Sequence, residues 1–353
     1  MIPRVVVLPE FTPVGLPTGA AHLRLLRPLA HPRVRERIHV YVRPTYAGEE
    51  TELVVVDRLW HPQVDRRRAE ALVRDVRRGK ARLVLHLDDD LWALPPERAA
   101  ERPEGFQEVL DLWLAEADAV WVSTPALAHR LQDRASRIQV LPPALDEQLL
   151  ILRDWSTLPR PPGPGRTVLG YMGTATHDED LALVIPALAE VAARRKGQIA
   201  LEIIGGAARA GTREALAGLP MPVHFWQGYP VEYPAFLAWF TGHVRWDIGL
   251  APLAPTPFNQ AKSDVKFLDY AALGAATVAS REPVYGRTVH HRVTGWLVDN
   301  RTEAWVQALL YLIDHPEERI RLARNARAFL LRERILDRRA GDWLRAIQAV
   351  LHG

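Results

Sequence analysis

The sequence predicts an α/β protein made of two Rossmann-like domains, each built on a parallel sheet. Short apolar runs of the kind that form buried parallel strands alternate with amphipathic helical segments along the chain. A stretch rich in proline and glycine, residues 158–166, interrupts this alternation and reads as a linker. The chain has 353 residues, which is too long for one average domain and suits two.

Composition limits the class of protein. Hydrophobic residues make up 48% and charged residues 25%, as in ordinary soluble globular proteins. No apolar run approaches the roughly 18 residues of a membrane span, and the first residues lead into a strand and not into a signal peptide, so we expect a cytoplasmic protein. The absence of cysteine excludes disulfides and thiolate metal ligands. The net charge is only 45 − 42 = +3, and aromatic residues are not interleaved with the arginines, so no nucleic-acid partner is expected.

Residues 1–157 are expected to form the first domain. A strand, a loop containing Gly15 and Gly19, and a helix open it, which is how a Rossmann-like sheet begins. The two glycines belong either to a ligand-binding cleft loop or to ordinary turns. The expected strands are residues 4–8, 38–42, 53–56, 82–87, 119–122 and 138–141, and the expected helices include 21–29, 69–78 and 106–116.

Residues 167–330 are expected to form the second domain, and residues 331–353 a C-terminal segment. The expected strands are residues 167–173, 199–204, 223–226, 246–253, 276–280 and 294–298. The expected helices are residues 181–195, 262–274, 302–314 and 316–332, with a basic amphipathic tail helix at 334–351.

Two lysines stand out in a chain that uses arginine at nearly every basic position. The chain has four lysines, and two of them, Lys262 and Lys266, lie four residues apart. In a helix over residues 262–274 they would share a face with Asp269. A lysine ammonium is a compact point charge that suits phosphate oxygens. The alternative is an ordinary solvated helix with a Lys-to-Asp pair.

Three consecutive acids follow the expected strand at residues 82–87. Asp88, Asp89 and Asp90 would lie at the carboxyl end of that strand, where ligands bind in sheets of this kind. Adjacent carboxylates can also cap a helix or bind a divalent cation. Among the histidines, His86 is expected in the core, and His177 either caps a helix or touches phosphate. No metal-ligand spacing such as H-E-x-x-H is present.

Several segments resemble, in order and spacing, the GT-B glycosyltransferases, and most closely the large retaining, nucleotide-sugar-using group called family 4. The resemblance spans nearly the whole chain and is strongest across residues 168–299. The segments that carry it are residues 118–124, 170–174, 247–253, 262–274, 277–280 and 294–298. It implies a GT-B fold, with two parallel sheets facing each other across an interdomain cleft and the tail helix packing back on the first domain.

The resemblance also implies roles for particular residues. The family carries two glutamates separated by seven residues, and Asp269 stands at the second, which holds the ribose hydroxyls. Ala261 stands at the first, which usually touches the donor sugar. The family's helix N-terminus for the diphosphate corresponds to residues 262–265. The family's Arg and Lys after the first strand of the second domain are absent, and we expect Lys262 and Lys266 to replace them.

The resemblance implies a set of site residues. Asp88 or Asp89 would orient or deprotonate the acceptor hydroxyl, and Lys262 would stabilise the charge on the departing diphosphate. The donor nucleotide and phosphates would be bound by Gly173, Thr174, Thr176, Lys262, Ser263, Val265, Lys266 and Asp269, with Gly15 and Gly19 as a cleft loop. No metal and no other cofactor is expected, because in the GT-B fold positive side chains and helix ends neutralise the diphosphate in place of a metal ion.

The implied activity is transfer of a sugar from a nucleoside-diphosphate sugar to a hydroxyl acceptor, with retention. The acceptor would be a glycan, a lipid-linked sugar or a small molecule. The alternatives are a sugar-nucleotide epimerase of the same fold and a non-catalytic nucleotide-sugar-binding homologue. The arginines of residues 66–68, 77–78 and 319–339 would form solvated helix faces or, with a lipid-linked acceptor, meet anionic lipid at the inner membrane face.

Overall fold

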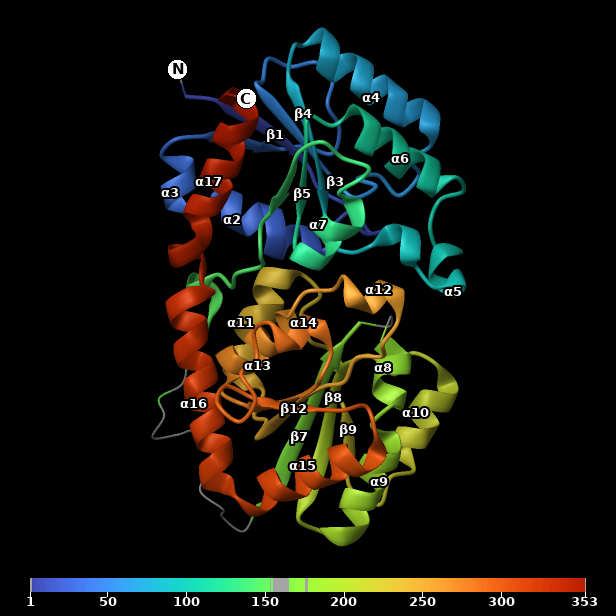
Figure 1. Cartoon of the computed structure of the whole chain (residues 1–353), viewed down its shortest axis with the longest axis vertical. Helices are drawn as coiled ribbons and strands as arrows, with labels where there is room; N and C mark the ends of the chain where they lie inside the picture. The colour runs from blue at the N-terminus through green and yellow to red at the C-terminus, as the bar shows by residue number, and fades with distance from the viewer. Residues whose placement is uncertain (1, 153, 155–164, 175–176, 353) are drawn as a thin grey trace.

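Two parallel sheets, one above the other in Figure 1, organise the chain in this computed structural model. The structure describes residues 2–152, 154, 165–174 and 177–352. Among these residues each sheet has six strands, and helices pack on both of its faces. The prediction of an α/β fold with two Rossmann-like parallel domains is therefore confirmed.

The first sheet has the strand order β2-β1-β3-β4-β5-β6. Its strands are β1 (Arg4–Leu8), β2 (His39–Val42), β3 (Leu53–Asp57), β4 (Arg82–Leu87), β5 (Ala119–Val122) and β6 (Ile138–Val140). Its helices are α1 (Gly19–Ala21), the π-helical turn η1 (His22–Leu26), α2 (Arg27–Ala30), α3 (Pro32–Arg35), α4 (Arg66–Arg78), η2 (Leu91–Ala93), α5 (Pro96–Ala99), α6 (Phe106–Glu116), α7 (Pro125–Leu131) and η3 (Glu147–Leu149). Central strands such as β3 are buried along their whole length, which explains their continuous apolar sequence.

The second sheet has the order β12-β11-β10-β7-β8-β9. Its strands are β7 (Thr167–Gly173), β8 (Ile199–Gly205), β9 (Val223–Phe225), β10 (Ile248–Ala251), β11 (Ala276–Ser280) and β12 (Trp296–Val298). Its helices are α8 (Asp178–Ala182), α9 (Ile185–Arg194), α10 (Ala210–Ala217), α11 (Tyr233–His243), α12 (Pro257–Gln260), α13 (Val265–Leu273), α14 (Pro283–Gly286), α15 (Thr302–Asp314) and α16 (Pro316–Glu333). Since β7 and β10 are neighbours, the strand order reverses between them, and this reversal is a topological switch point.

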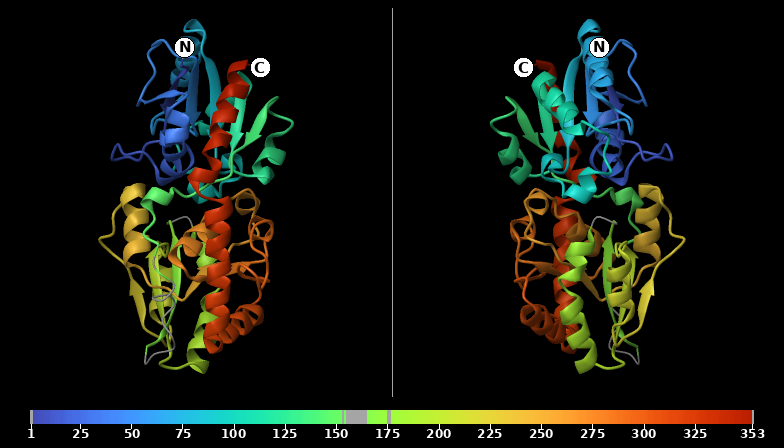
Figure 2. Two further views of the ribbon diagram at one scale, coloured as in Figure 1. Left: turned by 90° about the vertical axis from the view of Figure 1, so that its left-hand side faces the viewer. Right: turned by 90° about the vertical axis from the view of Figure 1, so that its right-hand side faces the viewer.

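The last helix, α17 (Leu336–His352), returns to the first sheet. Figure 2 shows α16 along one half of the molecule and α17 along the other, where the chain has crossed between them. Trp343 and Ile347 of α17 are fully buried in one cluster with Val5 and Val7 of β1. The crossing is held by Leu145, whose backbone exchanges hydrogen bonds with residues 334 and 336.

The described residues leave part of the predicted domain division untested. The first sheet ends at Val140 and the second begins at Thr167. Of the predicted linker, residues 158–164 lie outside the described residues. None of the helices in the described part of the chain combines the length and the apolar character needed to span a membrane.

One predicted helix is shorter than expected. The helix over residues 262–274 begins only at Val265, and Lys262 lies in the turn between α12 and α13. Ala261 is the C-cap of α12, and the Asp264 carboxylate forms a bidentate ion pair with Arg334, with both oxygens 2.8 Å from the guanidinium. These tertiary contacts set the start of α13, so Lys262 does not share a helical face with Lys266 as predicted. Lys266 and Asp269 do share one, three residues apart in α13.

Candidate functional site

The switch point of the second sheet brings two sequence segments together. Ligands of open α/β sheets bind outside the carboxyl ends of the strands at such a point. At that end, β7 leads toward His177, and β10 leads through α12 to the turn that carries Lys262. The strand order therefore gathers side chains that are far apart in the sequence.

Lys262, Lys266 and His177 form a basic cluster at this position. The Nζ atoms of Lys262 and Lys266 each lie 3.3 Å from Nε2 of His177. The Lys262 ammonium also lies 4.8 Å from the centre of the Phe258 ring. Among the described residues, neither ammonium group lies within ion-pair distance of a carboxylate, although Asp89 and Asp180 act favourably on both charges from further away.

The imidazole of His177 is neutral and its orientation is fixed. Nδ1 lies 2.6 Å from Oδ2 of Asp180, a carboxylate that also accepts hydrogen bonds from the Ala254 amide and the Asn259 side chain. Burial and the two nearby lysines together lower the pKa of His177 to about 3, although Asp180 acts in the opposite direction. Nδ1–H therefore donates to Asp180, and Nε2 is left as the acceptor that faces both lysines.

The basic cluster has the electrostatic properties of an anion site. Burial, together with the nearby Lys262, lowers the pKa of Lys266 to about 8. Burial also lowers the pKa of Lys262. Two ammonium groups beside a neutral imidazole create a local positive potential that a polyanion such as a diphosphate would neutralise.

Asp269, three residues after Lys266 in α13, has a carboxylate oxygen that accepts no hydrogen bond from the described residues. Its side chain is 4% exposed, and its Oδ1 is buried without a hydrogen-bond partner among the described residues. Burial raises the pKa of Asp269 to about 7, although Lys266 and Arg24 act in the opposite direction. A buried carboxylate oxygen without a donor is costly unless a ligand supplies one.

The other predicted donor-site residues lie at the same strand ends. Gly173 ends β7, and a Cβ on Gly205 would lie only 2.0 Å from its carbonyl oxygen, so the two strand ends approach more closely than side chains would allow. Thr174 follows directly, whereas Thr176 lies outside the described residues. Val265 is the half-buried first residue of α13.

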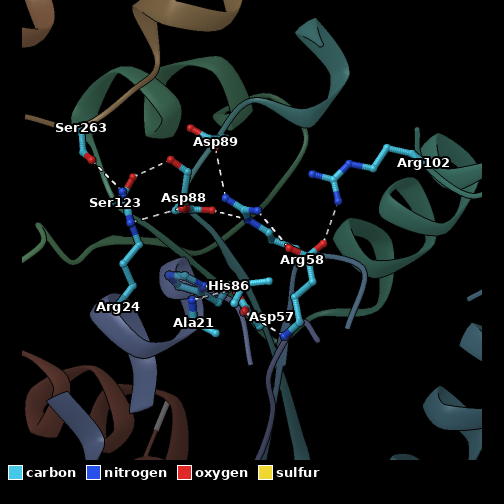
Figure 3. Close-up of polar contacts among 12 residues, drawn as sticks. Ala21, Arg24, Asp57, Arg58, His86, Asp88, Asp89, Arg102, Ser123 and Ser263 are labelled. Carbon is cyan, nitrogen blue, oxygen red and sulfur yellow. Dashed lines mark hydrogen bonds and ion pairs between the residues drawn. The ribbon is translucent and has the colours of Figure 1, made fainter. Parts of the chain in front are cut away.

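The first domain faces this site with an ionic network (Figure 3). Arg58 follows β3 in a left-handed conformation with a φ of 51°. Its guanidinium binds Asp88, Asp89 at 3.1 Å and Glu10 at 2.9 Å. Burial opposes ionisation of Asp88, but the ion pairs with Arg58 and Arg24 hold its pKa well below the ordinary value. Asp88 is thus a fixed, ionised carboxylate between two guanidinium groups, which makes it a weak base.

The neighbouring acids are also paired with arginine. Asp89 keeps a side-chain exposure of 24%, the highest of the three acids, and Asp90 lies 3.5 Å from Arg130. Asp57, one strand away, binds the buried His86 at 2.7 Å, which confirms His86 as a core residue. Within the described residues, no group of three or more His, Asp or Glu side chains is arranged to hold a metal ion.

Arg24 joins the first-domain network to the second domain. Its Nη1 lies 3.3 Å from Asp88, and its Nη2 donates a 2.7 Å hydrogen bond to Ser263 Oγ (Figure 3). Of the two glycines predicted for a cleft loop, Gly19 lies close to the second domain, since a Cβ added to it would be 3.8 Å from the Tyr233 ring. Gly15 has a φ of 80° and only open space around it, as a turn glycine would.

The sequence did not single out Arg24, Arg58 or Glu10. No local pattern marks one arginine among many, and the partners of Arg24 are distant in the chain. His177 was recognised only as a residue that either caps a helix or touches phosphate. The lysine spacing, by contrast, was visible in the sequence and does lead to the basic cluster.

Comparison with known proteins adds a family match for the second half of the chain. Residues 166–315 match the family of glycosyl transferases group 1. No curated protein matches the sequence at a significant level.

Solved structures with the same fold cover almost the whole chain. HepE from Anabaena, in complex with UDP and glucose, is 16% identical with a TM-score of 0.68, and the match covers 99% of this chain and 100% of that chain. Sucrose-phosphate synthase from Thermosynechococcus elongatus is 15% identical with a TM-score of 0.69 and the same coverage of both chains. A glycosyltransferase from Rickettsia africae ESF-5 is 12% identical with a TM-score of 0.65, covering 99% of this chain and 98% of that chain. These likenesses establish the GT-B fold predicted from the sequence.

Proposed function

We propose that this GT-B-fold chain, whose residues 166–315 match the glycosyl transferases group 1 family, is a glycosyltransferase that moves a sugar from a nucleoside-diphosphate sugar to a hydroxyl acceptor. The observation that carries the proposal is the basic cluster. Lys262 and Lys266 converge on the neutral His177 at the carboxyl ends of β7 and β10. Such a cluster would bind the diphosphate and stabilise the charge that develops on it when the glycosidic bond breaks.

The nucleoside would extend from the diphosphate toward Asp269. Its free Oδ1 is the acceptor that a ribose hydroxyl would satisfy. HepE was solved with UDP, and we propose a uridine nucleotide as the first donor to test. Gly173, Thr174, Thr176 and Val265 would line the phosphates from the strand end and the helix start.

The acceptor would bind on the first-domain side of the cleft. There Asp89 is the more exposed of the two acids proposed to orient or deprotonate the acceptor hydroxyl, and Asp88 would hold the arginines in place. Closure of the cleft would bring donor and acceptor together. We propose that transfer proceeds with retention and needs no metal, because lysines supply the positive charge that a cation would otherwise provide.

Two tests address these proposals. The first is a thermal-shift panel of nucleoside diphosphates and their sugars, with and without Mg²⁺ or EDTA, on wild type, Lys262→Ala and Lys196→Ala. Lys196 is an exposed lysine between α9 and β8, so its variant controls for loss of a positive charge. We expect one base to stabilise wild type regardless of metal, and Lys262→Ala to weaken that nucleotide's binding by about tenfold or more.

The second test follows product formation with the donor that binds. Retaining transfer would be supported if the nucleoside diphosphate is released only in the presence of an acceptor. The anomeric configuration of the product should then be that of the donor sugar. An isomerised sugar nucleotide formed without acceptor would support the epimerase alternative. Binding of donor without turnover would support the non-catalytic homologue, which Ala261 at the position of the family's first glutamate would permit. Failure of every nucleotide to bind would contradict the donor site itself.

The expectation of a solvated face is wrong for Arg319 and Arg327, which are buried because their guanidinium groups donate to backbone carbonyl oxygens. We further propose that the exposed arginines of these helices form solvated surfaces. In α4 and its neighbourhood, Arg66 pairs with Glu70 at 3.0 Å and Arg77 with Asp118 at 2.9 Å, so part of their charge is neutralised. Peripheral attachment to anionic lipid is the alternative if the acceptor is lipid-linked. Co-sedimentation with vesicles of anionic lipid, compared with neutral vesicles, separates the two.

A further inference from the structure

Arg24 is the one first-domain side chain described above that reaches the start of the donor-site helix α13. Its Nη2 donates to Ser263 Oγ at 2.7 Å, and Ser263 lies between Lys262 and Asp264, the N-cap residue of α13. Arg24 itself is 8% exposed. A buried guanidinium is therefore placed beside the segment where the proposed diphosphate would lie.

The guanidinium of Arg24 is not saturated with acceptors. Nη1 lies 3.3 Å from Asp88, and Nη2 uses the Ser263 hydroxyl, but Nε is buried without a hydrogen-bond partner among the described residues. Arginine offers five N–H donors in a planar fork that matches phosphate geometry. A buried, unpaired N–H beside a proposed anion site indicates that the ligand itself provides the missing acceptor.

The backbone around Arg24 is built to hold this side chain. Arg24 lies in the π-helical turn η1, an arrangement often found at functional sites. Its carbonyl oxygen accepts a 3.0 Å hydrogen bond from Nε1 of Trp343 in α17, and Trp343 is fully buried. On its other side, Asp88 is fixed by Arg58 (Figure 3). The tail helix and the acidic network thus orient one arginine toward the opposite domain.

The charge of a diphosphate compared with that of the basic cluster suggests a role for Arg24. Since His177 is neutral, Lys262 and Lys266 are the two cations of the basic cluster, and the sequence has no arginine or lysine at residues 174–180 after β7. A nucleoside diphosphate leaving group carries two to three negative charges. An arginine that approaches from the first domain would supply the remaining positive charge only when the cleft is closed.

We propose that Arg24 binds the terminal phosphate of the donor's diphosphate from the first domain, so that stabilisation of the leaving group depends on domain closure. This inference rests on the proposed function, because it takes the basic cluster as the diphosphate site. It assigns to Arg24 a direct contact with the leaving group.

The test compares diphosphate with monophosphate. The probes are the nucleoside diphosphate that stabilises wild type in the panel above and the corresponding monophosphate, each titrated against wild type, Arg24→Gln, Arg24→Lys and Arg27→Gln. Arg27 is the matched control, because it lies three residues further along and binds the buried Asp146 at 2.6 Å. Melting temperatures of the free variants report any loss of folding.

We expect Arg24→Gln to weaken diphosphate binding by about tenfold or more and monophosphate binding by less than about twofold, as loss of one charge-assisted contact predicts. Arg24→Lys keeps the charge but not the fork and should fall between wild type and Arg24→Gln. Arg27→Gln should leave the ratio of the two affinities unchanged. With a turned-over donor, kcat should fall more than KM rises, because the contact is made in the closed state.

Equal weakening of both nucleotides in Arg24→Gln, or no weakening of either, would overturn the proposal and leave Arg24 as a structural link to Ser263. If Arg24→Gln does not fold, the diphosphate-to-monophosphate ratio in Arg24→Lys decides in the same way. A wild type that binds no nucleotide contradicts the proposed function instead, and a wild type that binds without turnover still tests Arg24 through the two affinities.

Discussion

The hydroxyl of Thr124 donates a 2.8 Å hydrogen bond to the carbonyl oxygen of Ala261, and this bond crosses from the first domain to the second. Thr124 is the N-cap of α7, so the same hydroxyl also accepts from the Leu127 amide. Ala261 is 1% exposed and packs into the hydrophobic core of the first domain. The position where the resemblance expects a sugar-binding glutamate is therefore used here for contact between domains.

Restoring a glutamate at this position should harm the protein. In Ala261→Glu, a carboxylate would have to enter an apolar cluster or hold the two domains apart. We expect turnover to fall by at least about tenfold, or the melting temperature to drop, measured by steady-state kinetics and thermal unfolding. Ala261→Ser, which adds one hydroxyl group, is the control and should remain close to wild type. A rise in turnover for Ala261→Glu would show that the position still serves the donor sugar.

Local patterns predicted one part of the site and missed another. The spacing of Lys266 and Asp269 within one helix is a local property, and both lie where the sequence suggested. The contact between Arg24 and Ser263 joins residues 239 positions apart, and no periodicity encodes it. Tertiary contacts also shortened the predicted helix, since Asp264 is held by Arg334 from the end of α16.

The strand pattern was the most predictable feature, because continuous apolar runs require burial on both faces of a parallel sheet. The sheet order was not predictable in the same way. The adjacency of β7 and β10, which brings His177 to Lys262, follows from packing of the whole domain and not from any run of residues. For this reason the role of His177 was left open between helix capping and contact with phosphate.

Donor binding should weaken at alkaline pH because of Lys266. Burial and Lys262 place its pKa at about 8 in the free protein, so the ammonium loses its proton as the pH rises above that value. We expect the nucleotide dissociation constant of wild type to rise above pH 8, by up to about tenfold per pH unit. In Lys266→Arg the guanidinium stays charged, so the rise between pH 8 and 9.5 should be smaller than in wild type.

The nucleotide, Lys262 and Asp269 ionise in both proteins, so the difference between the two curves reports the titration of Lys266. Titration calorimetry at several pH values gives the two curves. An identical alkaline slope in wild type and Lys266→Arg would mean that another group titrates.

Gly170 in the middle of β7 should not tolerate a side chain. A Cβ there would lie 1.8 Å from the ring of Trp246, which is 4% exposed and donates a 2.9 Å hydrogen bond to Glu202. We expect Gly170→Ala to lower the melting temperature by several degrees, because overpacking of this kind costs about 1–3 kcal/mol. Gly211→Ala is the control: it lies in α10 with open space around it, so alanine should leave stability unchanged or raise it slightly. Equal melting temperatures for the two variants would contradict the tight packing of Trp246 on β7.

Ionisation of Asp269 should lower the stability of the folded protein as the pH rises. Its pKa is about 7 in the folded protein against a reference value of 3.8. Below pH 3.8 the group is protonated in both states, and it contributes no cost. Between pH 3.8 and 7 the unfolded chain loses the proton first, so the stability contributed by this group falls as the pH rises, and above pH 7 the folded protein bears the full cost of a buried charge.

Asp269→Asn removes that charge while keeping the shape of the side chain. We expect its melting temperature to exceed that of wild type by about 2 °C or more at pH 8, and by much less at pH 4.5. The groups that oppose the shift, Lys266 in the same helix and Arg24 from the first domain, are present in both proteins.

Asp269→Asn should also weaken the effect of the nucleotide. The amide offers one acceptor oxygen in place of two, so the stabilisation that nucleotide gives to wild type should shrink in the variant. Thermal unfolding at the two pH values, with and without the nucleoside diphosphate, measures both effects. A variant less stable than wild type at pH 8 would mean that the Asp269 carboxylate is already satisfied in the folded protein, and it would remove the reason for placing a ribose hydroxyl beside it.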